Sequence, residues 1–258
     1  MADASGLTKL ASPGLLGQRR KGREMRRKAE NRLDDIAEAA VTCFTDMGIK
    51  RTQMADVART AGVSAGTLYL YVTSKEALFH LAVLKVCGRP LDRLALPLAD
   101  PGIEKTVAVY AARVAEVAEW PALQEALNPG AKPDRTTLAT IGGELYDILH
   151  EARRAVWLLD HCAREVPEFD ALLSTDMRSH YRDDIAAVAL KAAGRPGAPD
   201  PAPRLSARLA IEIIAWAAMH RMKETPANLI DGLDEAGARK TATKGFAAIL
   251  LAAADHRY

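Results

Sequence analysis

A lysine stands at the start of a predicted helix in the stretch VSAGTLYLYVTSKE, residues 63–76. Thr73 and Glu76 have the T-x-x-E spacing of a capping box, in which both side chains satisfy backbone N–H groups of the first turn. Lys75 therefore lies in that first turn, where backbone N–H groups already carry partial positive charge. Such a place favours an anion, for example a phosphate. A solvated lysine that tolerates a small electrostatic penalty explains Lys75 equally well when it is considered alone.

Three predicted helices precede this lysine and would position it. Apolar residues recur at helical spacing from Ile36 to Met47, which predicts a helix with one buried face, and Gly48 follows as its C-terminal stop. Thr52 is placed to cap a second helix, and Ser64 a third of about two turns. Two short helices joined by a glycine-containing turn form a helix-turn-helix, whose second helix enters the DNA major groove. A purely structural helical hairpin is the alternative.

Residues 36–78 resemble the DNA-binding domain of the TetR family of transcriptional regulators. They follow its pattern, I..AA..CF...G...T...DVA..AGVS.GTLY.Y..SKE.L, with almost no change of spacing. Val72 stands where the family usually has phenylalanine, which suggests compensating bulk nearby, and Leu70 stands where histidine is common. The resemblance implies that the third helix lies in the major groove and that Lys75 binds a backbone phosphate. Further DNA contacts are expected at Thr52, Gln53, Ser64, Ala65, Gly66, Thr67, Tyr69 and Tyr71.

A basic segment, RRKGREMRRK at residues 19–28, precedes these helices with seven basic side chains and one acidic. We interpret it as an arm that follows the phosphates or enters the minor groove, with contacts from Arg26, Arg27 and Lys28; a solvated charged segment is the alternative. Residues 1–18 are expected to be disordered and contain no signal peptide. Residues 1–75 carry a net charge of +5 and the remainder −3, so the positive charge lies where DNA would bind.

The predicted fold class is all-α, in three parts: a flexible basic N-terminal arm at 1–28, a helix-turn-helix domain at 29–89, and a larger helical domain at 90–258. Helices of the larger domain are expected near 103–127, 135–164, 167–193, 205–223 and 236–255. The chain of 258 residues, 49% of them hydrophobic, is long enough for one small and one larger domain. The apolar run GFAAILLAAA is too short to span a bilayer, so no membrane partner is expected. Three widely separated cysteines favour a reducing cytoplasm over a disulfide framework.

Large or polarizable side chains on the C-terminal helices are candidates for lining an effector cavity, as in proteins of the TetR family. They are Trp120, Tyr146, His150, Trp157, His161 and Trp216. Ordinary core packing is the alternative for any one of them. Nothing resembles a nucleophile elbow, a phosphate-binding glycine loop or a zinc-binding HExxH helix, so no enzyme activity, cofactor or metal is predicted.

The last two predicted helices are apolar around most of their circumference, which predicts that a second copy of the chain covers them in a four-helix bundle. The predicted interface comprises Leu209, Ile213, Ile214, Ala217, Ala248 and Leu251; burial inside one chain is the alternative. Together with the resemblance, this predicts a homodimeric repressor that a small-molecule effector releases from a palindromic DNA operator. The competing hypothesis is an all-helical small-molecule-binding or enzyme domain whose basic N-terminus is incidental.

Overall fold

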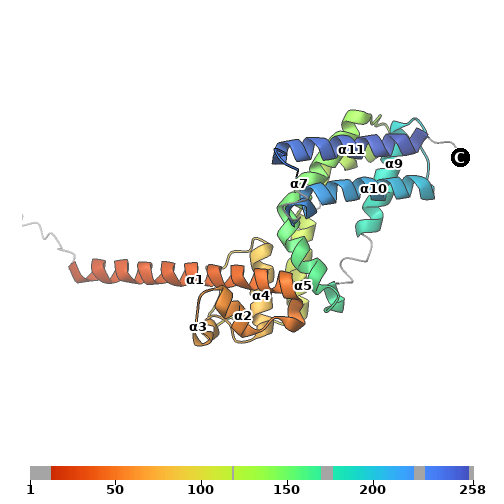
Figure 1. Ribbon diagram of the computed structural model, residues 1–258. Helices are drawn as coiled ribbons and strands as arrows, with labels where there is room; N and C mark the ends of the chain where they lie inside the picture. Colours follow the sequence, from red (N-terminus) through yellow and green to blue (C-terminus); the bar gives the residue numbers. More distant parts are fainter. Residues whose placement is uncertain (1–12, 118, 170–176, 224–229, 256–258) are drawn as a thin grey trace, which may run out of the picture. The chain divides into compact units, whose positions relative to one another are not determined.

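The computed structural model describes residues 13–117, 119–169, 177–223 and 230–255 (Figure 1). The elements of this described part are helices, with one isolated bridge between Val72 and Leu98, and the predicted all-α class is confirmed. Backbone contacts divide the chain into two compact units. The first contains the residues through Cys43 together with Thr52–Asp100, and the second contains Phe44–Arg51 and the residues from Pro101 onward. The domain boundary predicted between residues 89 and 90 stays a prediction.

The first unit is built from α1 (Pro13–Arg51), α2 (Met54–Thr60), α3 (Ala65–Tyr69) and α4 (Lys75–Val86). These helices bury one apolar face each, with Ile36, Val57, Leu68 and Leu78 fully inaccessible to solvent. The turn between α2 and α3 contains Gly62 at a φ of 65°, a conformation in which glycine has no steric penalty. The predicted helix-turn-helix is therefore present, with α3 as its second helix.

The predicted flexible arm is wrong in its conformation, because α1 already begins at Pro13 and residues 13–28 are helical. The physical reason is local: this stretch is rich in Arg, Lys, Glu and Met, which favour helix, and proline is well suited to the first helical position. Residues 1–12 lie outside the described part of the chain. Near its other end α1 is interrupted at Gly48, whose φ is 78°, before helical backbone resumes to Arg51.

Two predicted helix caps are off by one residue. The residue before α2 is Gln53, because the Thr52 hydroxyl points inward and donates to the carbonyl oxygen of Cys43 at 3.2 Å. The cap of α4 is Ser74, whose hydroxyl oxygen accepts from the Ala77 N–H at 3.1 Å. Thr73 has another partner, since its hydroxyl donates to the carbonyl oxygen of Leu98 at 3.2 Å. The predicted caps were chosen from local spacing, whereas these two hydroxyls are bound by remote carbonyls.

The connection between α4 and α5, residues 87–102, returns along the first unit. It leaves α4 after Val86, yet Leu98 pairs with the segment that precedes the start of α4. The Leu98 N–H donates to the Tyr71 carbonyl at 2.7 Å, and the Thr73 N–H donates to the Leu98 carbonyl at 3.0 Å. The connection is thereby hydrogen-bonded to the link between α3 and α4, beside the fully buried Val72.

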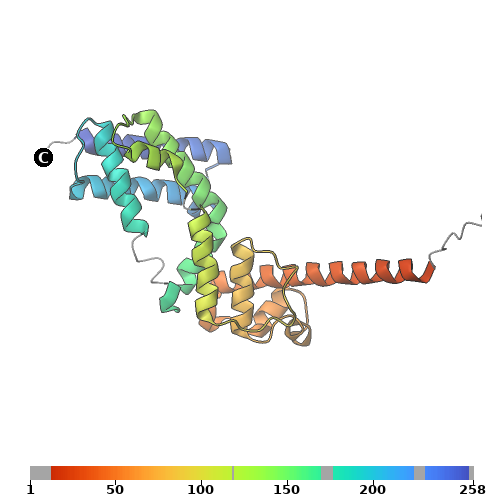
Figure 2. The same cartoon turned by 180° about the vertical axis from the view of Figure 1, so that it is seen from behind.

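The second unit contains α5 (Ile103–Val117), α6 (Pro121–Leu127), α7 (Arg135–Cys162), α9 (Met177–Ala192), α10 (Pro201–Ala218), the short 3₁₀ helix η1 (His220–Lys223) and α11 (Glu235–Asp255). Helices α10 and α11 lie side by side, and both pack against α7 and α9 around a core that includes Tyr146, Ile214 and Phe246 (Figures 1 and 2). No helix among the described residues is long and apolar enough to cross a membrane.

Three predicted helices of this unit have different limits. The helix expected at 103–127 is two helices, because Pro121 cannot continue a helix and instead begins α6. The helix expected from 205 begins at Pro201, since two prolines are tolerated within a first turn. Of the helix expected at 167–193, residues 167–169 and α9 are helical, and residues 170–176 between them lie outside the described part.

The last residues of α1 belong to this second unit through contacts with the chain after α7. The Lys50 N–H donates to Oε2 of Glu165 at 2.8 Å, and the Cys162 thiol lies 3.9 Å from the Phe44 carbonyl oxygen. There is no room for a side chain at Gly48, because a Cβ at this position would lie 2.8 Å from Oε1 of Glu165.

Candidate nucleic-acid interface

The start of α3 presents small, exposed residues. Ala65 and Gly66 are exposed, whereas Leu68 on the opposite face is fully buried in the first unit. Ser64 caps the helix, as predicted, by accepting a hydrogen bond from the Thr67 N–H at 3.0 Å. A helix end that carries no large side chain allows another molecule to approach its backbone closely.

Hydroxyl groups along α3 differ in their availability. The hydroxyls of Ser64 and Thr67 lie 2.8 Å apart and bond to each other, so a contact with DNA would have to share or replace this bond. Tyr69 is 50% exposed and directs its ring outward, while Tyr71 is half-buried. Tyr69 is thus the more accessible phenol of the two.

Lys75 is the first residue of α4, which confirms its predicted place in the first turn. Ser74 before it uses its side chain on the backbone N–H of Ala77. The remaining N–H groups of that turn and the ammonium carry positive charge, and Glu76, the next residue, adds one carboxylate to the same turn. The combination can hold a phosphate.

The predicted contact of Thr52 needs correction. Thr52 is fully buried and its hydroxyl is bound to Cys43, so its side chain cannot reach a phosphate. Gln53 is exposed, and the Asp56 carboxylate beside it already accepts the Gln53 N–H at 3.1 Å. Arg26, Arg27 and Lys28 lie on the helical N-terminal part of α1 rather than on an extended arm.

The predicted contacts do not include Leu70, which is 69% exposed immediately after α3. Helical spacing contains a signal for this, because Leu68 and Tyr71 share the inward face and Leu70 is not on it. An exposed leucine next to Tyr69 adds an apolar surface at the end of α3. Such a surface can contact the methyl group of a thymine.

The structure does not gather the six predicted effector residues in one place. Tyr146 and His150 are stacked, with ring centroids 6.1 Å apart, and Trp157 lies further along the same helix under the ammonium of Lys223. Trp120 packs edge-on against Tyr181 at 4.9 Å, and His161 lies beside Gly48.

Trp216 is wrong as a pocket residue, because it is 41% exposed on the outward face of α10. Ile214 and Ala217 are likewise wrong as interface residues: both are buried in the core of their own chain. Leu209 and Ala248 are exposed, and Ile213 and Leu251 are partly buried. Helix α10 therefore has distinct inward and outward apolar faces, although its sequence looks apolar on all sides.

Comparison with known proteins agrees with this local geometry. Residues 36–82 match the model of the family described as bacterial regulatory proteins, tetR family. The chain is 27% identical over 70 residues to the uncharacterized HTH-type transcriptional regulator YvdT of Bacillus subtilis, and 41% identical over 46 residues to the HTH-type transcriptional repressor KstR2 of Mycolicibacterium smegmatis. These matches cover 27% and 18% of this chain, and 36% and 22% of the two relatives.

A solved TetR-like transcriptional regulator from Rhodococcus sp. RHA1 has 20% sequence identity and a TM-score of 0.46, with 86% of this chain and 96% of that one covered. The geometry of α2, the glycine turn and α3 defines a helix-turn-helix module. Over residues 36–82 that module is similar to the DNA-binding module of bacterial regulatory proteins of the tetR family.

Proposed function

We propose that this protein is a sequence-specific DNA-binding transcriptional regulator, and that it acts as a repressor. The observation that carries the proposal is the tetR-family module, in which the small exposed start of α3 is followed by Lys75 at the positive end of α4. Ala65, Gly66, Thr67 and Tyr69 would face base edges and phosphates in the major groove, and Lys75 would hold one phosphate of the flanking backbone.

A homodimer is the second part of the proposal. Leu205, Leu209 and Trp216 are 61%, 49% and 41% exposed and recur along one face of α10. Beside them α11 exposes the small residues Ala248 and Ala252, and Gly245 packs against Ile213. Two copies joined through these faces would form a four-helix bundle with a dry core. The two-fold axis would then pair two recognition helices on a palindromic operator.

Release by a small-molecule effector is the third part. A ligand that raises the DNA dissociation constant 100-fold must bind the DNA-free conformation more tightly by about 2.7 kcal/mol. The two units are joined by α1 and by the α4–α5 connection, so either segment can transmit that difference. The connection pairs with the link between α3 and α4, which makes the tilt of α4 the candidate switch.

Selection from a random pool of double-stranded DNA tests this function directly. The full-length protein is expected to enrich an inverted repeat whose half-sites are separated by about one helical turn. Footprinting on the selected sequence should protect both half-sites. A protein that enriches no sequence and is not retained on heparin would contradict the proposal and favour a helical domain with an incidental basic N-terminus.

A further inference from the structure

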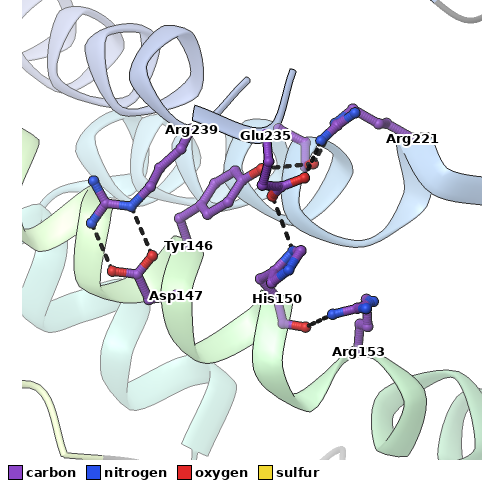
Figure 3. A network of polar contacts seen from close by, with 8 residues as sticks. Tyr146, Asp147, His150, Arg153, Arg221, Glu235 and Arg239 are labelled. Carbon is purple, nitrogen blue, oxygen red and sulfur yellow. Dashed lines mark hydrogen bonds and ion pairs between the residues drawn. The ribbon is translucent and has the colours of Figure 1, made fainter. Parts of the chain in front are cut away.

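The carboxylate of Glu235, at the start of α11, lies among polar side chains of two other elements, α7 and η1 (Figure 3). The Tyr146 hydroxyl donates to Oε1 at 2.5 Å, and the Arg221 guanidinium donates to Oε2. Nδ1 of His150 lies 3.0 Å from Oε1, although it is not aligned for a hydrogen bond. We call Tyr146, His150, Arg221 and the carboxylate that they surround the carboxylate site.

The residues around this site carry more positive than negative charge. Tyr146, His150, Arg153 and Trp157 follow one another at intervals of four, three and four residues, so they share one face of α7. Arg153 donates to the carbonyl of His150, and Lys223 of η1 lies 4.2 Å from the centre of the Trp157 ring. The carboxylate site itself contains one acidic group, the carboxylate of Glu235.

Two buried nitrogens along this face have no hydrogen-bond partner among the described residues. They are Nδ1 of His150 and Nε1 of Trp157. A buried polar nitrogen without a partner is unfavourable. This applies above all to Nε1 of Trp157, because Nδ1 of His150 already lies 3.0 Å from Oε1 of Glu235. The two residues are seven positions apart, which places them about 10 Å apart along the helix. An elongated molecule with one acidic end could reach both.

We propose that the carboxylate site is an anion-binding site with Glu235 as its resident anion, and that it accepts an organic carboxylate in place of Glu235. The proposal rests on the proposed function, since the incoming carboxylate would be the effector. A flat apolar body suits the ligand, because Trp157 offers an aromatic face and an indole N–H. The Arg221 fork and the Tyr146 hydroxyl recognise the two carboxylate oxygens, as they now recognise those of Glu235.

Displacement of Glu235 has a consequence for α11. Glu235 is the first residue of that helix, and its carboxylate joins α11 to α7 and η1. A ligand that takes its place releases this end of α11 from both neighbours. Asp147 and Arg239 form a second tie between α7 and α11 at 2.7 Å, so the helix would stay attached to the unit. The ligand therefore loosens one end of a helix that carries the proposed dimer face.

Chemical rescue tests the site. Glu235→Ala vacates it, and Glu235→Gln fills it with a neutral amide of nearly the same shape. Benzoate is the probe, benzamide is its uncharged analogue, and Asp147→Ala is the matched control that removes the other tie between the same two helices. At ten times its dissociation constant, benzoate should raise the Tm of Glu235→Ala by about 3 °C. Benzamide should leave it unchanged.

Titration calorimetry should show benzoate binding at least ten times more tightly to both Glu235 variants than to the wild type or to Asp147→Ala. Adding Arg221→Gln to Glu235→Ala should abolish the gain. Equal benzoate affinity for all variants, or equal stabilisation by benzamide, would overturn the anion site. Because neither readout involves DNA, a wild-type protein that selects no operator would contradict the proposed function alone. With an operator in hand, Glu235→Ala should bind DNA at least tenfold more weakly than the wild type even without benzoate, because this variant already lacks the tie that the ligand would release. Benzoate should weaken the DNA binding of Asp147→Ala no more than that of the wild type.

Discussion

Lys75 illustrates how much a single residue can indicate when its place on a helix is known. The first turn of α4 is an unfavourable position for an ammonium unless an anion is nearby. A phosphate contact fixes the orientation of a protein on DNA without reading the bases. The role of Lys75 is therefore visible in how affinity depends on salt and on sequence.

We expect Lys75→Ala to weaken DNA binding to a similar extent on all sequences. Each lost phosphate contact releases one counterion fewer, so the slope of log K against log salt should decrease by about one per protomer. Lys105→Ala, which removes an exposed lysine of α5, is the control and should leave the slope unchanged. Lost base discrimination at an unchanged slope would instead identify Lys75 as a residue that reads bases.

Cys162, in contrast, carries a thiol whose surroundings make it unreactive. Burial, with the nearby Glu165 carboxylate, raises the pKa of the Cys162 thiol to about 12. Only ~0.01% of such a thiol is ionised at pH 8, and the thiolate is the nucleophile. We expect iodoacetamide to leave Cys162 unmodified in the native protein and to label it in urea, as measured by peptide mass spectrometry. Rapid native labelling at this residue would contradict the burial.

Among the helices and their links, the α4–α5 connection is the feature that could not be expected from the sequence. Three hydrogen bonds join Leu98 to Tyr71 and Thr73, in the link between the recognition helix and α4. That link sets the angle between α3 and α4, which must suit the groove and the adjacent backbone together. The connection is thus a structural support for the candidate DNA interface.

Removing one of these bonds should weaken the first unit. Thr73→Val keeps the shape of the side chain but loses the hydroxyl that donates to Leu98, and should lower the free energy of unfolding by about 0.5–1.5 kcal/mol. Thr73→Ser retains the donor and serves as the control. Hydrogen exchange should show faster exchange of the Leu98 amide in Thr73→Val alone. Equal exchange in both variants would mean that the hydroxyl contributes nothing to this support.

The whole molecule combines two units through more than one stretch of chain. The backbone passes between them at Cys43–Phe44, Arg51–Thr52 and Asp100–Pro101. The proposed DNA contacts lie in the first unit, whereas the carboxylate site and the proposed dimer face lie in the second. Regulation would therefore depend on the chain segments that connect the two units.

Leu209→Asp should separate the dimer without unfolding the chain. Burial of a leucine side chain stabilises an interface by about 1.5–3 kcal/mol, and a dimer loses two of them, so its dissociation constant should rise at least about 100-fold. Ile230→Asp replaces another exposed apolar residue, 61% accessible and outside both helices, and should leave the dimer intact. Sedimentation and circular dichroism measure the two effects. A monomeric wild type, or a dimer that Leu209→Asp leaves untouched, would contradict this interface.

The first unit could be predicted largely from the sequence. The Ser64 cap, the turn at Gly62 and the place of Lys75 in the first turn of α4 could be predicted, because each depends on residues within about four positions of one another. The helical spacing of the apolar residues likewise predicted an all-α chain. Local signals of this kind act before any tertiary contact is made.

Tertiary structure alone decided where the hydroxyls of Thr52 and Thr73 bond and which face of α10 turns inward. It also brought Glu235 to Tyr146, 89 positions away in the sequence. The spacing of residues in the sequence cannot indicate such partners, because they come together only when distant helices pack. An apolar side chain looks the same in the sequence whether its own chain or a second copy covers it, and so Ile214 and Leu209 could be told apart only by their burial.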